Sequence, residues 1–95
     1  MTPEGLVKKE INKILDAHGA FYRMVVPTGY GKKELDYHLI HSGRGALIEA
    51  KRPGKDSTAF QKNVRREAER AGAKVFLITG QPEEYQELIK WLEGP

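Results

Sequence analysis

Two apolar segments joined by a two-residue turn constrain the fold of this chain most strongly. Residues 35–41 and 44–51 are rich in strand-forming side chains, and Ser42-Gly43 between them has the composition of a tight β-hairpin turn. Such a turn sets one register, with the facing pairs His41 and Arg44, Tyr37 and Ile48, and Asp36 and Glu49. The last pair places two carboxylates on one face of the hairpin, with β-carbons about 4.5–5.5 Å apart.

Two facing carboxylates repel each other unless a cation lies between them. A hard divalent ion is the natural cation, because it takes oxygen ligands. Lys51 shares the face of Glu49, since side chains two residues apart on a strand point the same way. Ala46-Leu47-Ile48 is wholly apolar and indicates a strand buried on both faces, where an unpaired glutamate is costly. The pattern indicates metal-dependent phosphodiester chemistry, although Glu49-Ala50-Lys51 also fits an ordinary salt-bridged strand end.

Size and charge limit what such a site can be. The 95 residues make one small domain with a single core, so we expect a shallow surface site. The 16 Lys and Arg residues against 13 Asp and Glu give a net charge of +3, with the excess clearest between Lys32 and Arg70. That asymmetry suits a polyanion, although a mixed-charge soluble surface would have the same balance.

Several other types of site are excluded by the composition. There is no cysteine, so disulfides and thiolate zinc sites are ruled out. His38 and His41 are three positions apart on a predicted strand and point to opposite faces, so they do not form a metal-binding pair. There is no apolar run of membrane-spanning length and no signal-peptide core, so we expect a soluble, cytoplasmic protein without membrane contact.

The remaining segments predict three helices and two further strands. In chain order, the expected elements are a helix from Pro3 to about His18 capped by Thr2, a strand over 20–26, the two hairpin strands, a helix capped by Asp56 or Ser57 and continuing to about Ala71, a strand over 74–79, and a closing helix from Pro82. The last strand follows a helical crossover, so it pairs in parallel with a strand of the preceding antiparallel meander. The expected fold is α/β, with a mixed four-stranded sheet flanked by helices.

Two polar side chains lie on the inward stripes of their helices. Glu4 heads the stripe that continues with Val7 and Ile11, and Gln61 lies on the stripe of the helix that follows the hairpin. Each has a simpler explanation, compensation of the helix dipole for Glu4 and ordinary backbone hydrogen bonding for Gln61. The residues expected on the outer sides of the first helix are Lys8, Lys9, Glu10 and Lys13.

Taken together, these residues resemble the PD-(D/E)xK nuclease superfamily, and within it the VRR-NUC domain, the virus-type replication-repair nuclease. The resemblance covers nearly the whole chain, whose small size is similar to that of the stand-alone phage members. The matching segments are Thr2-Pro3-Glu4-Gly5, Pro27-Thr28-Gly29-Tyr30-Gly31, Asp36, Glu49-Ala50-Lys51-Arg52-Pro53-Gly54-Lys55, Gln61 and Ala71-Gly72-Ala73. The family usually has Gly-x-Pro before its strand-opening aspartate, whereas this chain has Lys33-Glu34-Leu35, so Glu34 is a candidate additional acidic group.

The resemblance implies a restriction-endonuclease-like fold in the order α-β-β-β-α-β-α and hydrolysis of phosphodiester bonds with Mg²⁺ or Mn²⁺. The implied metal ligands are Asp36, Glu49, the Ala50 carbonyl and, for a second ion or a bound water, Glu4. Lys51 would orient and polarise the attacking water, and Gln61 would position Lys51 or that water.

The implied partner is DNA, bound mainly through its phosphates. Candidate DNA contacts are Lys32, Lys33, Arg52, Lys55, Lys62, Arg65 and Arg66. Contacts of this kind predict salt-sensitive binding that is independent of sequence. Arg65 has an alternative partner, because Glu69 lies one helical turn further on.

Three functions remain open at the level of sequence. The first is a structure-directed endonuclease that acts as a homodimer on branched DNA, similar to a junction resolvase. The apolar side of the closing helix, including Trp91, is then a candidate dimer surface, although Trp91 also fits the core. The second is a monomeric nickase or flap endonuclease with the same chemistry. The third is a non-catalytic DNA-binding module.

Overall fold

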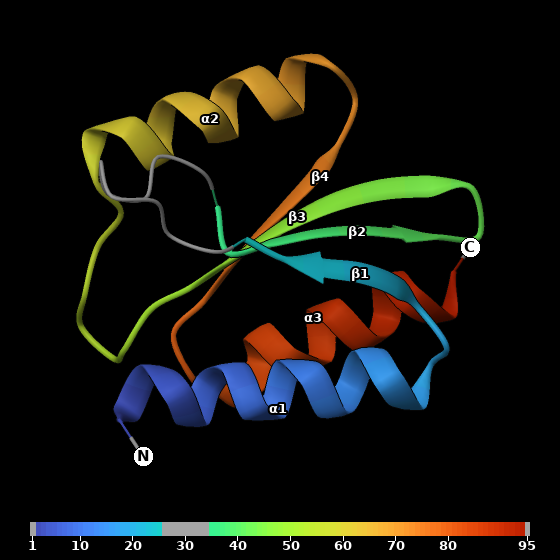
Figure 1. Ribbon diagram of the computed structural model, residues 1–95, viewed down its shortest axis with the longest axis horizontal. Coiled ribbons are helices and arrows are strands. Elements are labelled where there is room, and N and C mark those ends of the chain that lie inside the picture. The colour runs from blue at the N-terminus through green and yellow to red at the C-terminus, as the bar shows by residue number, and fades with distance from the viewer. Residues whose placement is uncertain (1, 26–34, 95) are drawn as a thin grey trace.

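Helices lie on both sides of a mixed four-stranded sheet in the computed structural model, which describes residues 2–25 and 35–94 (Figure 1). The elements in this part of the chain are α1 (Pro3–Ala17), β1 (Phe21–Met24), β2 (Tyr37–His41), β3 (Arg44–Ala50), α2 (Ala59–Arg70), β4 (Lys74–Ile78) and α3 (Pro82–Glu93). The predicted α/β class and element order are confirmed.

The strands lie in the order β1-β2-β3-β4. β1–β2 and β2–β3 are antiparallel, and β3–β4 is parallel, as the crossover through α2 predicts. In the β2–β3 turn, Ser42 and Gly43 have φ values of 52° and 75°. Two consecutive positive φ values match the twist of the flanking strands, which keeps this hairpin in register.

The predicted register of the hairpin is confirmed up to its last pair. Tyr37 faces Ile48 and His41 faces Arg44, but the ladder ends at Tyr37, so Asp36 lies one residue before β2. The direct pairing of Asp36 with Glu49 is therefore not part of the ladder. Asp36 instead reaches β3 through its side chain, as described below.

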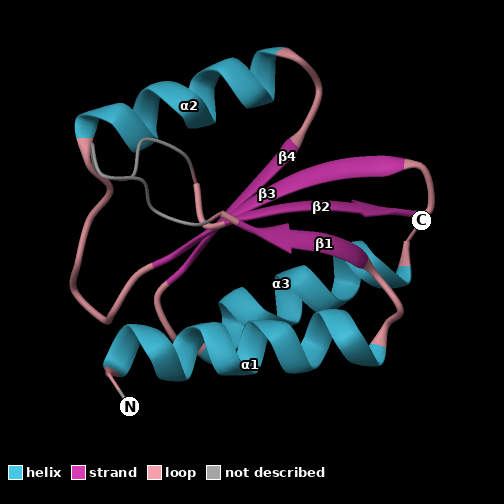
Figure 2. Ribbon diagram, viewed as in Figure 1, coloured by secondary structure: helices cyan, strands magenta, loops and turns pink. Residues whose placement is uncertain are grey.

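α1 and α3 lie on one side of the sheet and α2 lies on the other (Figure 2), and the core is on the side of α1 and α3. The fully buried side chains of α1 and α3 include Ile11, Leu15 and Leu88, which pack with Tyr37 and Ile48 of the sheet. In α2 the buried residue is Gln61. The apolar stripe predicted for α2 therefore contributes little to the core.

The ends of three predicted elements are corrected by the structure. Of residues 20–25 of the predicted first strand, β1 contains only Phe21–Met24, and residue 26 lies outside the described residues. β3 ends at Ala50, so Lys51 follows the strand. The N-cap of α2 is Thr58 instead of Asp56 or Ser57. The physical reason is that Thr58 and Gln61 form a reciprocal capping box, which satisfies two backbone donors at once.

No helix within residues 2–25 and 35–94 is both long and apolar enough to cross a membrane.

Candidate active site at the ends of the hairpin strands

Asp36 is buried one residue before β2, with 3% of its surface exposed. Its main-chain oxygen accepts a hydrogen bond from the Val25 nitrogen at 2.9 Å, and its Oδ2 accepts one from the Ala50 nitrogen at 2.6 Å. The second bond joins the two hairpin strands one step beyond the last ladder pair. Asp36 thus lies beside the β3 end where the sequence predicts the metal site.

Glu49 is still more deeply buried, with 1% of its surface exposed. Its Oε2 accepts a hydrogen bond from the Ser57 hydroxyl at 2.7 Å, and Lys51 Nζ lies 3.7 Å from its Oε1. At that separation the ammonium attracts the carboxylate but does not form a hydrogen bond of ordinary length. Within the described residues, Glu49 Oε1 has no hydrogen-bond partner.

Lys8 reaches this site, which corrects the expectation that it faces outward. Its Nζ lies 3.4 Å from Asp36 Oδ1 and 3.5 Å from Glu4 Oε2. The ammonium therefore lies between two of the predicted metal ligands and partly neutralises both. The spacing of Glu4 and Lys8, one helical turn apart, is the sequence signal that could have identified this contact.

Glu4 lies nearer the surface than its position on the apolar stripe predicts. Its side chain is 42% exposed, and it is connected to Asp36 through the Lys8 ammonium. Glu10, by contrast, is exposed as predicted. Glu4 therefore lies at the edge of the site, at the first turn of α1.

Gln61 is buried, as predicted, and its hydrogen bonds follow the simpler of the two explanations. Its side-chain Oε1 accepts a hydrogen bond from the Thr58 main-chain nitrogen at 3.0 Å. The Gln61 main-chain nitrogen in turn donates to Thr58 Oγ1 at 3.2 Å. These bonds complete the cap of α2. A role of Gln61 toward Lys51 or a water stays a prediction.

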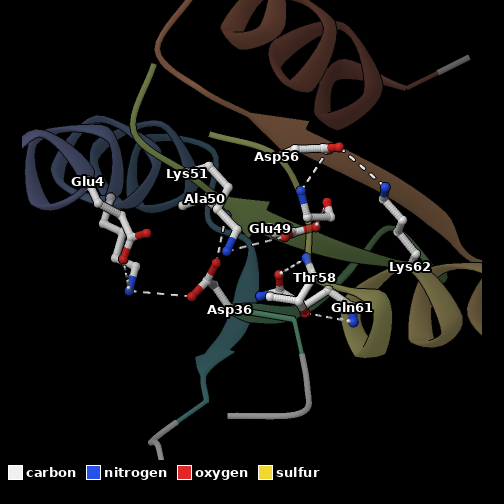
Figure 3. A network of polar contacts seen from close by, with 11 residues as sticks. Glu4, Asp36, Glu49, Ala50, Lys51, Asp56, Thr58, Gln61 and Lys62 are labelled. Atoms are coloured by element: carbon white, nitrogen blue, oxygen red, sulfur yellow. Dashed lines mark hydrogen bonds and ion pairs between the residues drawn. The ribbon is translucent and has the colours of Figure 1, made fainter. Parts of the chain in front are cut away.

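Figure 3 shows how these side chains come together from separate elements. Asp36, Glu49 and Lys51 converge at the ends of β2 and β3, with Glu4 at one side on α1 and Gln61 at the other on α2. The part of the chain that the structure describes contains no ready-made group of three or more His, Asp or Glu side chains spaced to hold a metal ion. The two buried carboxylates and the orphaned Glu49 oxygen nevertheless match the donor chemistry that a hard cation takes.

The predicted DNA-binding residues fall into three groups. Arg52, Lys55 and Arg66 are exposed. Lys62 pairs with Asp56 at 3.2 Å, and Arg65 pairs with Glu69 at 3.4 Å, as the alternative for Arg65 predicts. Lys32 and Lys33, together with Tyr30 and Glu34, lie outside the described residues.

Asp56 is an ionised partner of Lys62, one of the predicted DNA-binding residues. A hydrogen bond from the Ser57 backbone nitrogen, followed by the bond and charge of Lys62, holds the pKa of the Asp56 carboxyl below its ordinary value. Asp56 therefore stays ionised and offsets the charge of Lys62. For DNA binding this makes Lys62 a weaker candidate than the exposed Arg66.

Comparison of the chain with protein-family models, with curated proteins and with solved structures finds no match.

Proposed function

We propose that the protein is a metal-dependent, structure-specific DNA endonuclease with its active site at Asp36, Glu49 and Lys51. The observation that carries the proposal is the buried oxygen Glu49 Oε1, which has no hydrogen-bond partner among the described residues and lies 3.7 Å from Lys51 Nζ. A buried acceptor left without a donor costs about 1–3 kcal/mol. A cation bound at that oxygen would remove this cost.

The buried charges are poorly explained by stability alone. Replacing a buried ion pair with apolar side chains is often neutral or stabilising, so such a pair is weak support for a purely structural role. This chain buries Asp36 and Glu49 in a domain of 95 residues that has one small core. A function that needs charge at this position accounts for the cost.

Each residue has a task that follows from its position. Asp36, Glu49 and the Ala50 carbonyl would hold Mg²⁺ or Mn²⁺, with Glu4 reaching a second ion or a water from α1. When bound, the ion supplies positive charge for the phosphate and acidifies a water molecule. Lys51, whose side chain is 12% exposed, would orient the attacking water and offset the charge that develops on the phosphate.

The proposed substrate is branched DNA, cut by a homodimer similar to a junction resolvase. A chain this small presents little surface for reading a branch, and a two-fold pair would place one site on each side of a junction. Trp91 contributes to packing within the chain, because its ring meets Phe76 edge-on at 6.0 Å and carries the Arg44 guanidinium at 4.3 Å. The dimer surface would therefore lie elsewhere than at Trp91.

The test is cleavage of four-way junctions, flaps and plain duplex with Mg²⁺, with Mn²⁺ and with EDTA. Asp36→Asn, Glu49→Gln and Lys51→Met are expected to lower the cleavage rate roughly 100-fold or more, as removal of a transition-state contact does. Glu67→Gln and Lys9→Met make the same chemical changes at exposed positions and serve as matched controls. Circular dichroism checks folding, and calorimetry measures Mn²⁺ binding independently of cleavage.

Two results would overturn the proposal. One is a wild type that leaves every DNA structure intact with both ions, and the other is site variants that cut as fast as the controls. Binding of DNA without cleavage would identify the non-catalytic binding module. If cleavage occurs, light scattering and the preferred substrate separate a dimeric junction enzyme from a monomeric nickase or flap endonuclease.

A further inference from the structure

The sheet face on the α2 side is open over β1 and β2. Phe21 of β1 faces Ile40 of β2, and each is 56% exposed. The next pair along the strands, Arg23 and His38, is also exposed. Ile40 faces Gly45 on its other side, where no side chain fills the space.

These residues line a groove of about 510 Å³ between the sheet and the C-terminal end of α2. We call it the sheet groove, and its floor is formed by Phe21, Arg23, His38 and Ile40, with Ala68 and Ala71 at its α2 side. Its described lining residues combine apolar surface with the positive charge of Arg23, and none of those within residues 2–25 and 35–94 is Asp or Glu. An occupant with apolar faces and negative charge fits this lining.

Arg23 lies over the Phe21 ring in the groove. Its guanidinium carbon lies 4.4 Å from the centre of the Phe21 ring, and its Nη1 donates to the Tyr22 carbonyl at 2.8 Å. Arginine planes and aromatic rings are the surfaces on which unpaired bases stack. Because Arg23 and Phe21 are already stacked on each other, a base would find this platform ordered in advance.

The sheet groove leads directly to the candidate active site. His38 and Leu47 face each other in the hairpin, and Asp36 and Glu49 lie two residues further along the same strands. Two residues span about 6.6–6.8 Å along a strand. The groove therefore begins beside the carboxylates, at Arg23, His38 and Leu47, and runs from there toward the hairpin turn, where Phe21, Ile40 and Gly45 lie.

We propose that the sheet groove binds an unpaired DNA strand next to the cleavage site. The proposal rests on the proposed nuclease function and narrows its substrate to DNA with a single-stranded arm beside the cut. Duplex DNA would present its phosphates to the groove, since paired bases are stacked and unavailable. A second copy of the chain related by a two-fold axis is the competing occupant, and self-association of the groove variants tests for it.

The experiment measures binding of a fluorescent oligo-dT strand and of a matched duplex in EDTA, by anisotropy. Phe21→Ala is expected to weaken binding of the strand roughly tenfold, the loss typical of one base stack. Arg23→Ala and Arg23→Lys are both expected to weaken it, because lysine keeps the charge but lacks the plane. Phe21→Trp is expected to restore binding.

Phe60→Ala is the matched control, because Phe60 is 60% exposed on α2 and does not line the groove. Duplex binding is expected to be the same for Phe21→Ala and wild type. Because both Phe21 and Arg23 are exposed, their variants are expected to fold, which circular dichroism checks.

The outcomes separate this proposal from the proposed function. If wild type binds the strand and Phe21→Ala does not, strand binding by the sheet groove is supported. If the same wild type cuts no DNA, only the proposed nuclease function is rejected. If Phe21→Ala, Arg23→Ala and Phe60→Ala all bind like wild type, the groove proposal is wrong. It is also wrong if the Phe21 and Arg23 variants abolish self-association and leave strand binding unchanged, which would identify a dimer interface.

Discussion

The two buried carboxylates differ in how completely their oxygens are satisfied. Asp36 Oδ2 accepts a backbone hydrogen bond, and its Oδ1 lies beside the Lys8 ammonium. Glu49 has one hydroxyl donor on Oε2, whereas its Oε1 has only the more distant charge of Lys51. Glu49 is therefore the residue at which a bound cation would change the local energy most.

The first residue-scale prediction concerns Ser57. Ser57→Ala is expected to lower the free energy of unfolding of the metal-free protein by about 1–3 kcal/mol, because it leaves a second buried oxygen of Glu49 without a donor. Urea unfolding of the single variants Ser57→Ala and Glu49→Gln and of the double variant measures the coupling. Additive effects within about 0.5 kcal/mol would show that the Ser57 bond does not stabilise Glu49.

The second concerns Lys8, whose ammonium lies close to Asp36 and Glu4, two of the proposed metal ligands. Lys8→Met is expected to destabilise the protein in EDTA, because Asp36 loses a nearby positive charge. It is also expected to bind Mn²⁺ more tightly, because the ammonium no longer competes for Glu4 and Asp36. Thermal melts in EDTA and calorimetry with Mn²⁺ measure the two effects.

Lys9→Met is the control for Lys8→Met, because Lys9 is exposed on the same helix. Weaker Mn²⁺ binding by Lys8→Met than by Lys9→Met would contradict this account. In that case Lys8 would support the metal site instead of competing with it.

The third concerns the pH dependence of stability through Tyr37. Burial, followed by the effect of Tyr22, raises the pKa of Tyr37 far above its ordinary value of 10.0, while its hydroxyl donates to Asn12 Oδ1 at 2.7 Å. The folded state holds this proton more tightly than the unfolded state does, so its contribution is complete below pH 10 and is lost as the pH rises further. Tyr37→Phe is expected to reduce the alkaline loss of stability by about 1.4 kcal/mol per pH unit.

Unfolding in urea from neutral pH to above pH 10 checks this prediction. The comparison with wild type removes the contribution of the lysines, which lose their charge in the same range. Parallel alkaline curves for Tyr37→Phe and wild type would show that Tyr37 does not carry the effect.

At the scale of elements, the start of α2 is stabilised by Gln61, for which the sequence predicted a catalytic role. The capping box between Thr58 and Gln61 begins α2 directly after Ser57, the donor to Glu49. The helix start therefore orders the segment that lies over the site. In the proposed active site, Gln61 would act through this helix start.

This position of Gln61 gives the fourth prediction. Thr58→Ala and Gln61→Ala are each expected to cost about 1 kcal/mol of unfolding free energy. Thr58→Ser is expected to retain stability, because serine keeps the hydroxyl acceptor of the box. Chemical denaturation measures all three, and a Thr58→Ser variant as unstable as Thr58→Ala would rule out the capping role.

At the scale of the whole molecule, the two sides of the sheet have different tasks. α1 and α3 bury apolar side chains against one face, whereas α2 buries Gln61 and leaves the neighbouring part of the other face exposed. The stable core and the proposed DNA-binding surface therefore lie on opposite sides. Changes on the α2 side are expected to affect binding more than folding.

The fifth prediction uses this separation to test the basic surface. Arg66→Ala and Lys55→Ala are each expected to weaken binding to duplexes of any sequence and to lower the salt slope of binding by about 1. Lys62→Ala is expected to have a smaller effect, because Asp56 already offsets its charge. Anisotropy at increasing salt measures the slopes, with Lys90→Ala on α3 as the control; equal slopes for Arg66→Ala and Lys90→Ala would refute the assignment.

Local spacing was enough to predict the element order, the hairpin register as far as Tyr37 and Ile48, and the burial of Glu49 and Gln61. Each of these depends on the period of a helix or strand and on turn residues such as Ser42-Gly43, which are local properties of the chain. The α2 cap was predicted at Asp56 or Ser57, but the Ser57 hydroxyl donates to Glu49 and Thr58 accepts the capping bond from the Gln61 main-chain nitrogen.

The remaining features depended on packing between elements far apart in the chain. Lys8 reaches Asp36 only because α1 lies across the sheet, and a long flexible side chain can turn inward or outward from the same helical position. The sheet groove is open because α2 does not cover β1 and β2, and no spacing within a strand reveals which part of a face a helix leaves bare. Sequence spacing therefore identified which side chains share a face of a helix or strand. Only the placement of the helices on the sheet decided which of these faces contact each other and which stay open.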